Sequence, residues 1–170
     1  MFINYGIEAM DNNVLKLMKK GLRREQVVKG VEWTLEAGIS PGLNILFSNL
    51  GDTKETLQKA VDFLVKYGDQ AQRRTIRPVT PYPGSPLYDM AIDQGLLEGP
   101  ADFYEKKHLN SDLLCCNFTE LTNDEVYECL EDANKQLAQN IFDKNRDKAM
   151  AQIENLYPKM TPRSAASARA

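Results

Sequence analysis

Short apolar runs alternate with amphipathic stretches along the first hundred residues. Residues 2–7 (FINYGI) and 43–47 (LNILF) are mostly apolar and of strand length, and residues 74–77 (RTIR) form a third, shorter candidate. A nearly continuous apolar run such as 43–47 is typical of a parallel strand that is covered on both faces. Each run is followed by a stretch with helical spacing, so the pattern predicts parallel βα units with right-handed crossovers.

Glycines and capping residues indicate where the intervening helices begin and end. A short helical segment near residues 14–18 is followed by a longer helix from about 23 to 37. We expect Asp52 to be the N-cap of the next helix, with Glu55 at its third position, and Gly68 to end that helix.

A loop with four prolines, residues 78–86, precedes the last helix of this part of the chain. The helix is expected over residues 87–94. The prolines restrict the backbone, so a rigid strand-to-helix connection is one sufficient explanation for this loop.

The pattern changes after residue 98. A short helical piece is expected near residues 102–107, followed by irregular chain with a short extended stretch at residues 113–118. Thr122 and Glu125 form a capping box that opens a long helix, predicted to reach about residue 144, with a second segment to 156.

These changes divide the chain into three parts. Residues 1–98 form the α/β part, residues 99–160 a helical extension, and residues 161–170 a small, polar tail that we expect to be disordered.

Composition excludes several classes of protein. The 170 residues carry a net charge of −3 with a pI near 5.3, which argues against a nucleic-acid-binding protein because phosphate neutralisation needs a basic face. No apolar run approaches the roughly 20 residues that span a bilayer, and the N-terminus lacks the pattern of a signal peptide. We therefore expect a cytoplasmic protein that does not interact with membranes.

The three cysteines, Cys115, Cys116 and Cys129, do not have the spacing of a metal site. An odd number of thiols fits a reducing compartment, and we interpret them as packed or half-exposed free cysteines. No metal ligand is therefore assigned.

Polar and small residues follow each predicted strand. The segments 6–11, 47–52 and 77–81 should all lie at the carboxyl edge of the sheet, where parallel β/α proteins place their ligand sites. Small residues there let a ligand approach the backbone, so this edge is the candidate binding site.

Three segments resemble radical S-adenosylmethionine (radical SAM) enzymes, in the same order and at similar spacing. They are "GIEAMDNNVLKLMKKGL", "AGISPGLNILFSNLGDTKETL" and "TIRPVTPYPGSPLYDMA". The matching family patterns are GIES-G-S-D-x-VL-x-x-M-x-K-G, FIFG-x-PG-[ED]T and P-x-TP-[YR]-PGTPLY. The resemblance spans roughly residues 2–97 and is strongest to members that also carry a cobalamin-binding domain.

The resemblance implies a partial β/α barrel, of which this chain would hold the last three units. It also implies S-adenosylmethionine as cofactor beside a [4Fe–4S] cluster, with cobalamin bound through a further domain. The family's C-x-x-x-C-x-x-C loop, which holds the cluster, does not occur in these 170 residues. We therefore expect the chain to be the C-terminal half of such an enzyme.

Site residues are carried over from the resemblance position by position. In the family, the position of Glu8 contacts S-adenosylmethionine, and that of Asn44 faces the ribose or methionyl part. The turn Ser48-Asn49-Leu50-Gly51 takes the place of the glycine-rich turn that passes the adenosine, with Ser48 in place of glycine and Leu50 in place of proline.

The remaining site residues follow the third predicted strand. Val79 and Thr80 match the stretch whose backbone lies beside the adenine. Arg77 faces the same mouth and is a candidate for binding a substrate carboxylate. No catalytic residue is assigned.

Plainer interpretations of the same residues remain open. Glu8 also fits a solvated loop carboxylate, Arg77 a structural ion pair, and the single histidine, His108, a surface or hydrogen-bonded role. The basic cluster in residues 16–24 is typical of a solvated helix face.

Two hypotheses for function follow. The first is a fragment of a radical SAM enzyme, whose parent would generate a 5′-deoxyadenosyl radical by reductive cleavage of the cofactor; the fragment would be inactive alone. The alternative is a non-catalytic α/β module that binds a ligand or pairs with another subunit, or with the missing half, through the open barrel edge. The substrate is not specified by these residues.

Overall fold

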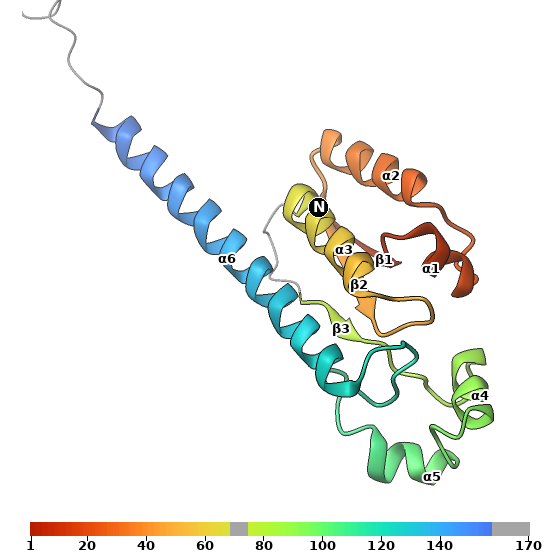
Figure 1. Ribbon diagram of the computed structural model, residues 1–170. Helices are drawn as coiled ribbons and strands as arrows, with labels where there is room; N and C mark the ends of the chain where they lie inside the picture. Colours follow the sequence, from red (N-terminus) through yellow and green to blue (C-terminus); the bar gives the residue numbers. More distant parts are fainter. Residues whose placement is uncertain (69–74, 158–170) are drawn as a thin grey trace, which may run out of the picture.

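A computed structural model describes residues 1–68 and 75–157. Strands β1 (Phe2–Glu8), β2 (Ser40–Phe47) and β3 (Arg77–Pro78) form a parallel sheet in the order β1–β2–β3 (Figure 1). The predicted α/β class, with parallel strands followed by a helical C-terminal extension, is therefore confirmed.

Helices connect the strands and continue beyond them. They are α1 (Asn12–Leu17), α2 (Arg24–Glu36), α3 (Lys54–Tyr67), α4 (Pro86–Asp93), α5 (Pro100–Asp102), the π-helical turn η1 (Phe103–Lys107) and α6 (Asn123–Leu156). No helix in the described ranges has both the length and the apolar character needed to cross a membrane.

The cap of α3 differs from the predicted one. Thr53, not Asp52, is the N-cap, and its side chain accepts a hydrogen bond from the Thr56 backbone N–H. Asp52 is turned inward instead, where its carboxylate closes the preceding turn by accepting from the Asn49 backbone N–H at 2.9 Å. Glu55 consequently lies one position too early to complete a capping box.

The third strand is shorter than predicted. Only Arg77 and Pro78 pair with β2, and Arg74, where the predicted strand began, lies outside the described residues. Ile76 does not join a neighbouring strand, because its backbone N–H and C=O bond to the side chain of Asn134 on α6.

Two expectations for the C-terminal part were also wrong. Residues 113–118 contain no strand. Helix α6 is one continuous element of 34 residues, not two segments, because no glycine or proline interrupts residues 123–156. Its predicted start is confirmed: Thr122 caps it, and Glu125 completes the capping box.

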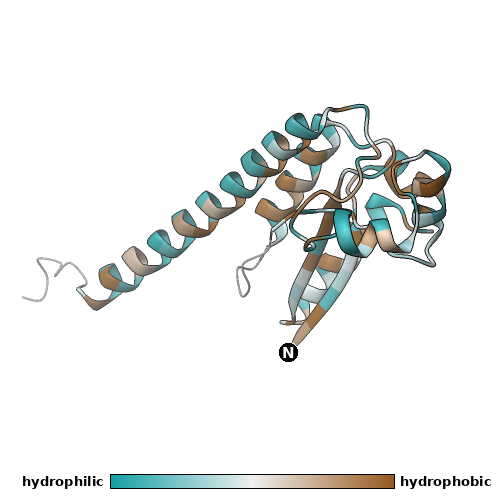
Figure 2. Ribbon diagram, turned by 90° about the horizontal axis from the view of Figure 1, so that it is seen from below, coloured by the Kyte–Doolittle hydropathy of each residue, from teal (hydrophilic) through white to brown (hydrophobic). Residues whose placement is uncertain are grey.

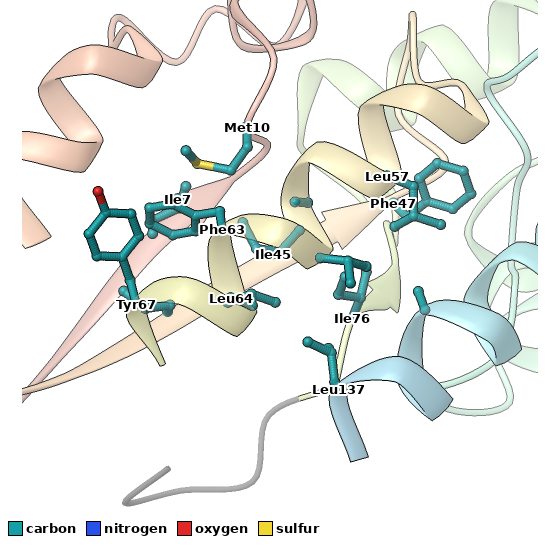
Figure 3. Close-up of a cluster of buried hydrophobic side chains, with 14 of the residues drawn as sticks. Ile7, Met10, Ile45, Phe47, Leu57, Phe63, Leu64, Tyr67, Ile76 and Leu137 are labelled. Atoms are coloured by element: carbon teal, nitrogen blue, oxygen red, sulfur yellow. The ribbon is translucent and has the colours of Figure 1, made fainter. Parts of the chain in front are cut away.

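The main core lies between the sheet and the helices that cover it. Side chains from β1 and β2 meet the apolar faces of α2 and α3 and the first half of α6. Figure 3 shows Ile7, Ile45 and Phe63 gathered in this cluster, with Ile76 and Leu137 at the α6 side. Burial of this apolar area contributes most to the stability of the sheet and so holds its strand ends in place.

A second apolar cluster covers part of the carboxyl edge of the sheet. Cys115, Cys116 and Phe118, from the irregular chain before α6, are buried with Val79 and Phe103. Residues 115–118 thus form a segment over the ends of β2 and β3, the covering segment.

Candidate functional site

The three polar segments identified in the sequence follow three neighbouring parallel strands. β1 ends at Glu8, which lies opposite Ile45, and β2 ends at Phe47, which lies opposite Pro78. The segments therefore lie along one edge of the sheet, where parallel β/α folds bind ligands.

Glu8 is held by its backbone and by one ion pair. Its φ of 71° is in the left-handed region, which is uncommon for a residue with a side chain. Its Oε1 lies 3.2 Å from Nζ of Lys20, and the glutamate side chain is 20% exposed. A Cβ at Gly6 would lie 2.7 Å from that same Oε1, so the carboxylate folds back over Gly6 and would have to shift if that residue carried a side chain.

Ser48 repeats this backbone conformation at the end of the neighbouring strand. Its φ is 69°, its side chain is fully buried, and its Oγ has no hydrogen-bond partner among the described residues. Two strained non-glycine residues at adjacent strand ends are unusual, and such strain is concentrated at functional sites.

The Asn49–Asp52 turn is closed by a buried carboxylate. Asp52 accepts from the Asn49 backbone N–H and, through Oδ1, from the Thr56 hydroxyl at 2.9 Å. Burial raises the pKa of Asp52 to about 6, and these hydrogen bonds only partly oppose the effect. The turn therefore contains a carboxyl group that titrates near neutral pH.

Gly51 brings this turn against α1. A Cβ at Gly51 would lie 2.7 Å from Cδ1 of Leu17 and 3.4 Å from Nδ2 of Asn13, and its φ of 78° is also left-handed. The left-handed φ favours glycine here, and the absence of a side chain lets the turn pack closely on Leu17 and Asn13 of α1.

The candidates on and after β3 differ in exposure. Arg77 is exposed and its Nε lies 2.9 Å from Oδ1 of Asp112, so the structure shows the ion pair that the sequence left open. Val79 is buried and its backbone N–H donates to Phe47 O at 2.8 Å. Thr80 is half-buried at the same edge.

Asn44 lies within β2, opposite Gly6 of β1, and is half-buried. It is therefore one residue pair inside the edge, below Glu8.

The covering segment lies directly over the β2 end of the edge. The Phe118 backbone N–H donates to Ser48 O at 3.3 Å, and Cys115 and Cys116 pack behind it. The side chains of Ser48, Asn49 and Val79 are consequently shielded, whereas Glu8, Gly51, Arg77 and Thr80 remain at least partly accessible.

The thiols lie in an apolar environment. Burial raises the pKa of Cys115, and it raises the pKa of Cys116 to about 12. Their Sγ atoms are 3.9 Å apart and all three cysteines are free. Within residues 1–68 and 75–157, no group of three or more His, Cys, Asp or Glu side chains is arranged to hold a metal ion. The cysteines present therefore do not fit a [4Fe–4S] cluster, which needs three converging thiolates.

Three residues at this edge escaped the sequence interpretation. Lys20 was assigned to a solvated basic face, yet it binds Glu8. Asp112 and Phe118 belong to the irregular chain, and their contacts at the edge depend on its tertiary path. No local pattern in the sequence signals either contact.

Comparison with known proteins gives one distant relative and no family assignment. No family model matches the chain. An uncharacterized methyltransferase of Pyrococcus horikoshii is 26% identical over 95 residues, which is 56% of this chain. The match covers only 20% of that protein's length.

Proposed function

We propose that this chain is part of an S-adenosylmethionine-dependent enzyme of the radical SAM type and contributes one wall of its cofactor site. The observation that carries the proposal is the alignment of the three family-like segments at the ends of three adjacent parallel strands. The name of the Pyrococcus relative, a methyltransferase, supports S-adenosylmethionine as the ligand. In this proposal the three-stranded sheet is one half of a partial β/α barrel.

The accessible residues of the edge suit parts of this cofactor. Glu8 presents a carboxylate, which accepts hydrogen bonds from ribose hydroxyls or from an amino group. In this proposal the adenine passes Thr80 and the backbone after β3, and the exposed Arg77 exchanges its ion pair with Asp112 for a substrate carboxylate. Bound S-adenosylmethionine supplies an activated methylsulfonium group.

The described residues provide no place for an iron–sulfur cluster, so no reductive step is assigned to them. We propose that the chain is inactive by itself. Purified protein should be colourless and should not cleave S-adenosylmethionine after anaerobic reconstitution with iron and sulfide. The appearance of cluster absorbance together with turnover would contradict this part of the proposal.

Calorimetric titration of the full chain with S-adenosylmethionine tests the binding site. We expect saturable binding that weakens at least tenfold in Glu8→Gln, because the amide cannot replace a charged acceptor. Glu25→Gln is the matched control, since Glu25 is an exposed glutamate on α2 whose carboxylate accepts a hydrogen bond from Asn12. Absence of binding by the wild-type chain, or equal loss in both variants, would refute the assignment.

A pairing function is the second candidate, and the position of β1 at the end of the strand order favours it. Within the described residues, β1 has a neighbouring strand on one side only, and Ile3 on this strand is 37% exposed. Unprotected edge strands pair readily with another strand. Size-exclusion chromatography with light scattering should then show association that Ile3→Lys reduces. A stable monomer that binds no ligand would oppose both candidate functions.

A further inference from the structure

Helix α1 and the turn that leads into α2 line a hollow of about 850 Å³ that opens to solvent, and its size suits a small ligand. The residues that line it come from one continuous stretch of chain: Asn12, Asn13, Leu15, Lys16, Lys19, Gly21, Leu22, Arg23 and Gln26. No acidic residue is among them. None of these lining residues is among the candidate residues of the cofactor site.

Three cations of this hollow have no carboxylate partner in the part of the chain that the structure describes. Lys16, Lys19 and Arg23 take part in none of its ion pairs, whereas the adjacent Lys20 is paired with Glu8. The nearby carboxylate of Asp11 is already bound to Lys59 at 2.6 Å. The local positive charge contrasts with the net charge of −3 of the whole chain.

Side-chain amides hold the backbone around the hollow. Asn12 Oδ1 accepts from the Arg24 backbone N–H at 2.8 Å, and Gln26 Oε1 accepts from the Arg23 backbone N–H at 2.9 Å. The amides thus fix the turn that carries Arg23 relative to α1. Leu15 is fully buried beneath, so the hollow combines an apolar floor with a cationic rim.

The hollow adjoins the candidate cofactor edge through two contacts. Lys20 follows Lys19 directly and reaches Glu8 at the end of β1. Asn13, which lines the hollow, lies against Gly51 of the turn after β2. A molecule bound in the hollow would therefore be close to the ends of β1 and β2.

We propose that this hollow binds the anionic group, phosphate or carboxylate, of a small-molecule substrate. That the anion belongs to a substrate depends on the proposed function. Anion binding itself is inferred only from the charges and the shape of the hollow. Three cations around one anion supply electrostatic attraction, and no ion pair among the described residues already uses their charges. Because these side chains are exposed, the attraction is screened by salt and binding should weaken as ionic strength rises.

Calorimetry at low ionic strength, with inorganic pyrophosphate and with citrate as separate probes, tests the site on the full chain. We expect saturable binding of at least one probe, and the better one indicates phosphate or carboxylate recognition. The triple variant Lys16→Gln/Lys19→Gln/Arg23→Gln should bind at least tenfold more weakly. The control Lys29→Gln/Lys107→Gln/Lys148→Gln, which removes the same charge outside the hollow, should change affinity less than twofold.

The possible results separate this proposal from the cofactor proposal. Equal weakening in both triple variants, or no saturable binding of either probe by the wild-type chain, would overturn the anion site. Circular dichroism confirms that each variant is folded before it is titrated. Anion binding without S-adenosylmethionine binding would retain the hollow as a site and refute the cofactor proposal, and the reverse result would do the opposite.

Discussion

Ser48 is a non-glycine residue in a conformation that suits glycine. A side chain at φ 69° costs about 1–2 kcal/mol, and the buried Oγ gains no hydrogen bond from any described residue in return. We predict that Ser48→Gly stabilises the chain by about 1 kcal/mol, measured as a higher midpoint of urea unfolding.

Ser40→Gly is the matched control for that substitution. The Ser40 hydroxyl also has no hydrogen-bond partner in the part of the chain that the structure describes, but Ser40 begins β2 in extended backbone, where glycine costs about 0.5–1 kcal/mol. Opposite signs for the two serines would attribute the effect to backbone strain. If both variants lose stability, the free energy gained by relieving strain at Ser48 is smaller than the free energy lost because glycine makes the unfolded chain more flexible.

Asp52 links stability to pH near neutrality. Its pKa in the folded chain is about 6, above its ordinary value of 3.8, so the folded state binds this proton more tightly than the unfolded state. The stabilisation is complete below about pH 4 and is lost as pH rises through 6, by up to about 3 kcal/mol.

We predict that Asp52→Asn flattens this part of the pH profile. The difference in unfolding free energy between wild type and variant should change between pH 4 and 7, as followed by urea denaturation. A carbon-detected NMR titration of the Asp52 carboxyl gives an independent midpoint. Parallel profiles for the two proteins would contradict the assignment.

At the scale of elements, one asparagine joins α6 to Ile76, the residue that precedes β3. Asn134 Nδ2 donates to Ile76 O at 3.0 Å, and its Oδ1 accepts from the Ile76 N–H at 2.9 Å, as a neighbouring strand would. Asn134→Leu leaves both backbone groups unpaired and should destabilise the chain by about 2–4 kcal/mol. Asn145→Leu, on an exposed part of the same helix, should change stability by less than about 0.5 kcal/mol in the same thermal or urea melt. Equal effects would show that the paired amide contributes little.

This contact also illustrates which elements were predictable. The apolar runs 2–7 and 43–47 and the capping box at Thr122 are local signals, and the structure bears them out. Ile76 lies in a short run whose partner is a side chain 58 residues away, and no local pattern reports that. Asp52 and Thr53 are both good caps, so the choice between them depended on whether a carboxylate was needed inside the preceding turn.

The site was predictable to a similar degree. The strands are parallel, so the segments that follow β1, β2 and β3 lie at one edge of the sheet. The alternation of strands and helices along the sequence predicts this arrangement. Which side chains are accessible there depends on the covering segment, whose irregular path has no periodic signal. Sequence reasoning therefore located the edge but not the shielding of Ser48, Asn49 and Val79.

At the scale of the whole molecule, α6 is much longer than the body it packs on. Its 34 residues correspond to about 51 Å, and its buried side chains, Val126, Leu130, Ala133 and Leu137, all lie in the first half. Figures 1 and 2 show the second half extending away from the rest of the fold. The last hydrogen bond to the body in the described residues joins Lys144 Nζ to Val65 O at 2.8 Å.

The part of α6 that follows Lys144, residues 145–156, should be only marginally stable. An isolated helix shorter than about 12–15 residues gains too little from its own hydrogen bonds to remain folded in water. We predict by hydrogen exchange that backbone amides of residues 126–137 are protected close to the global unfolding limit, whereas those of 146–156 exchange almost as fast as in an unstructured peptide.

Protein concentration provides the control for this measurement. The second half of α6 exposes Phe142, next to the last contact with the body, and Met150, Ile153 and Leu156 beyond it, and these side chains are 67%, 52%, 50% and 73% accessible. On a helix these side chains fall on one face, because their spacings follow its turn. Protection of residues 146–156 that grows with concentration would mean that this apolar face associates with another copy of the chain. Strong protection at every concentration would contradict the prediction and show that residues 145–156 are stable without a partner. Fast exchange of these residues at every concentration would show that α6 is ordered only where it packs on the body.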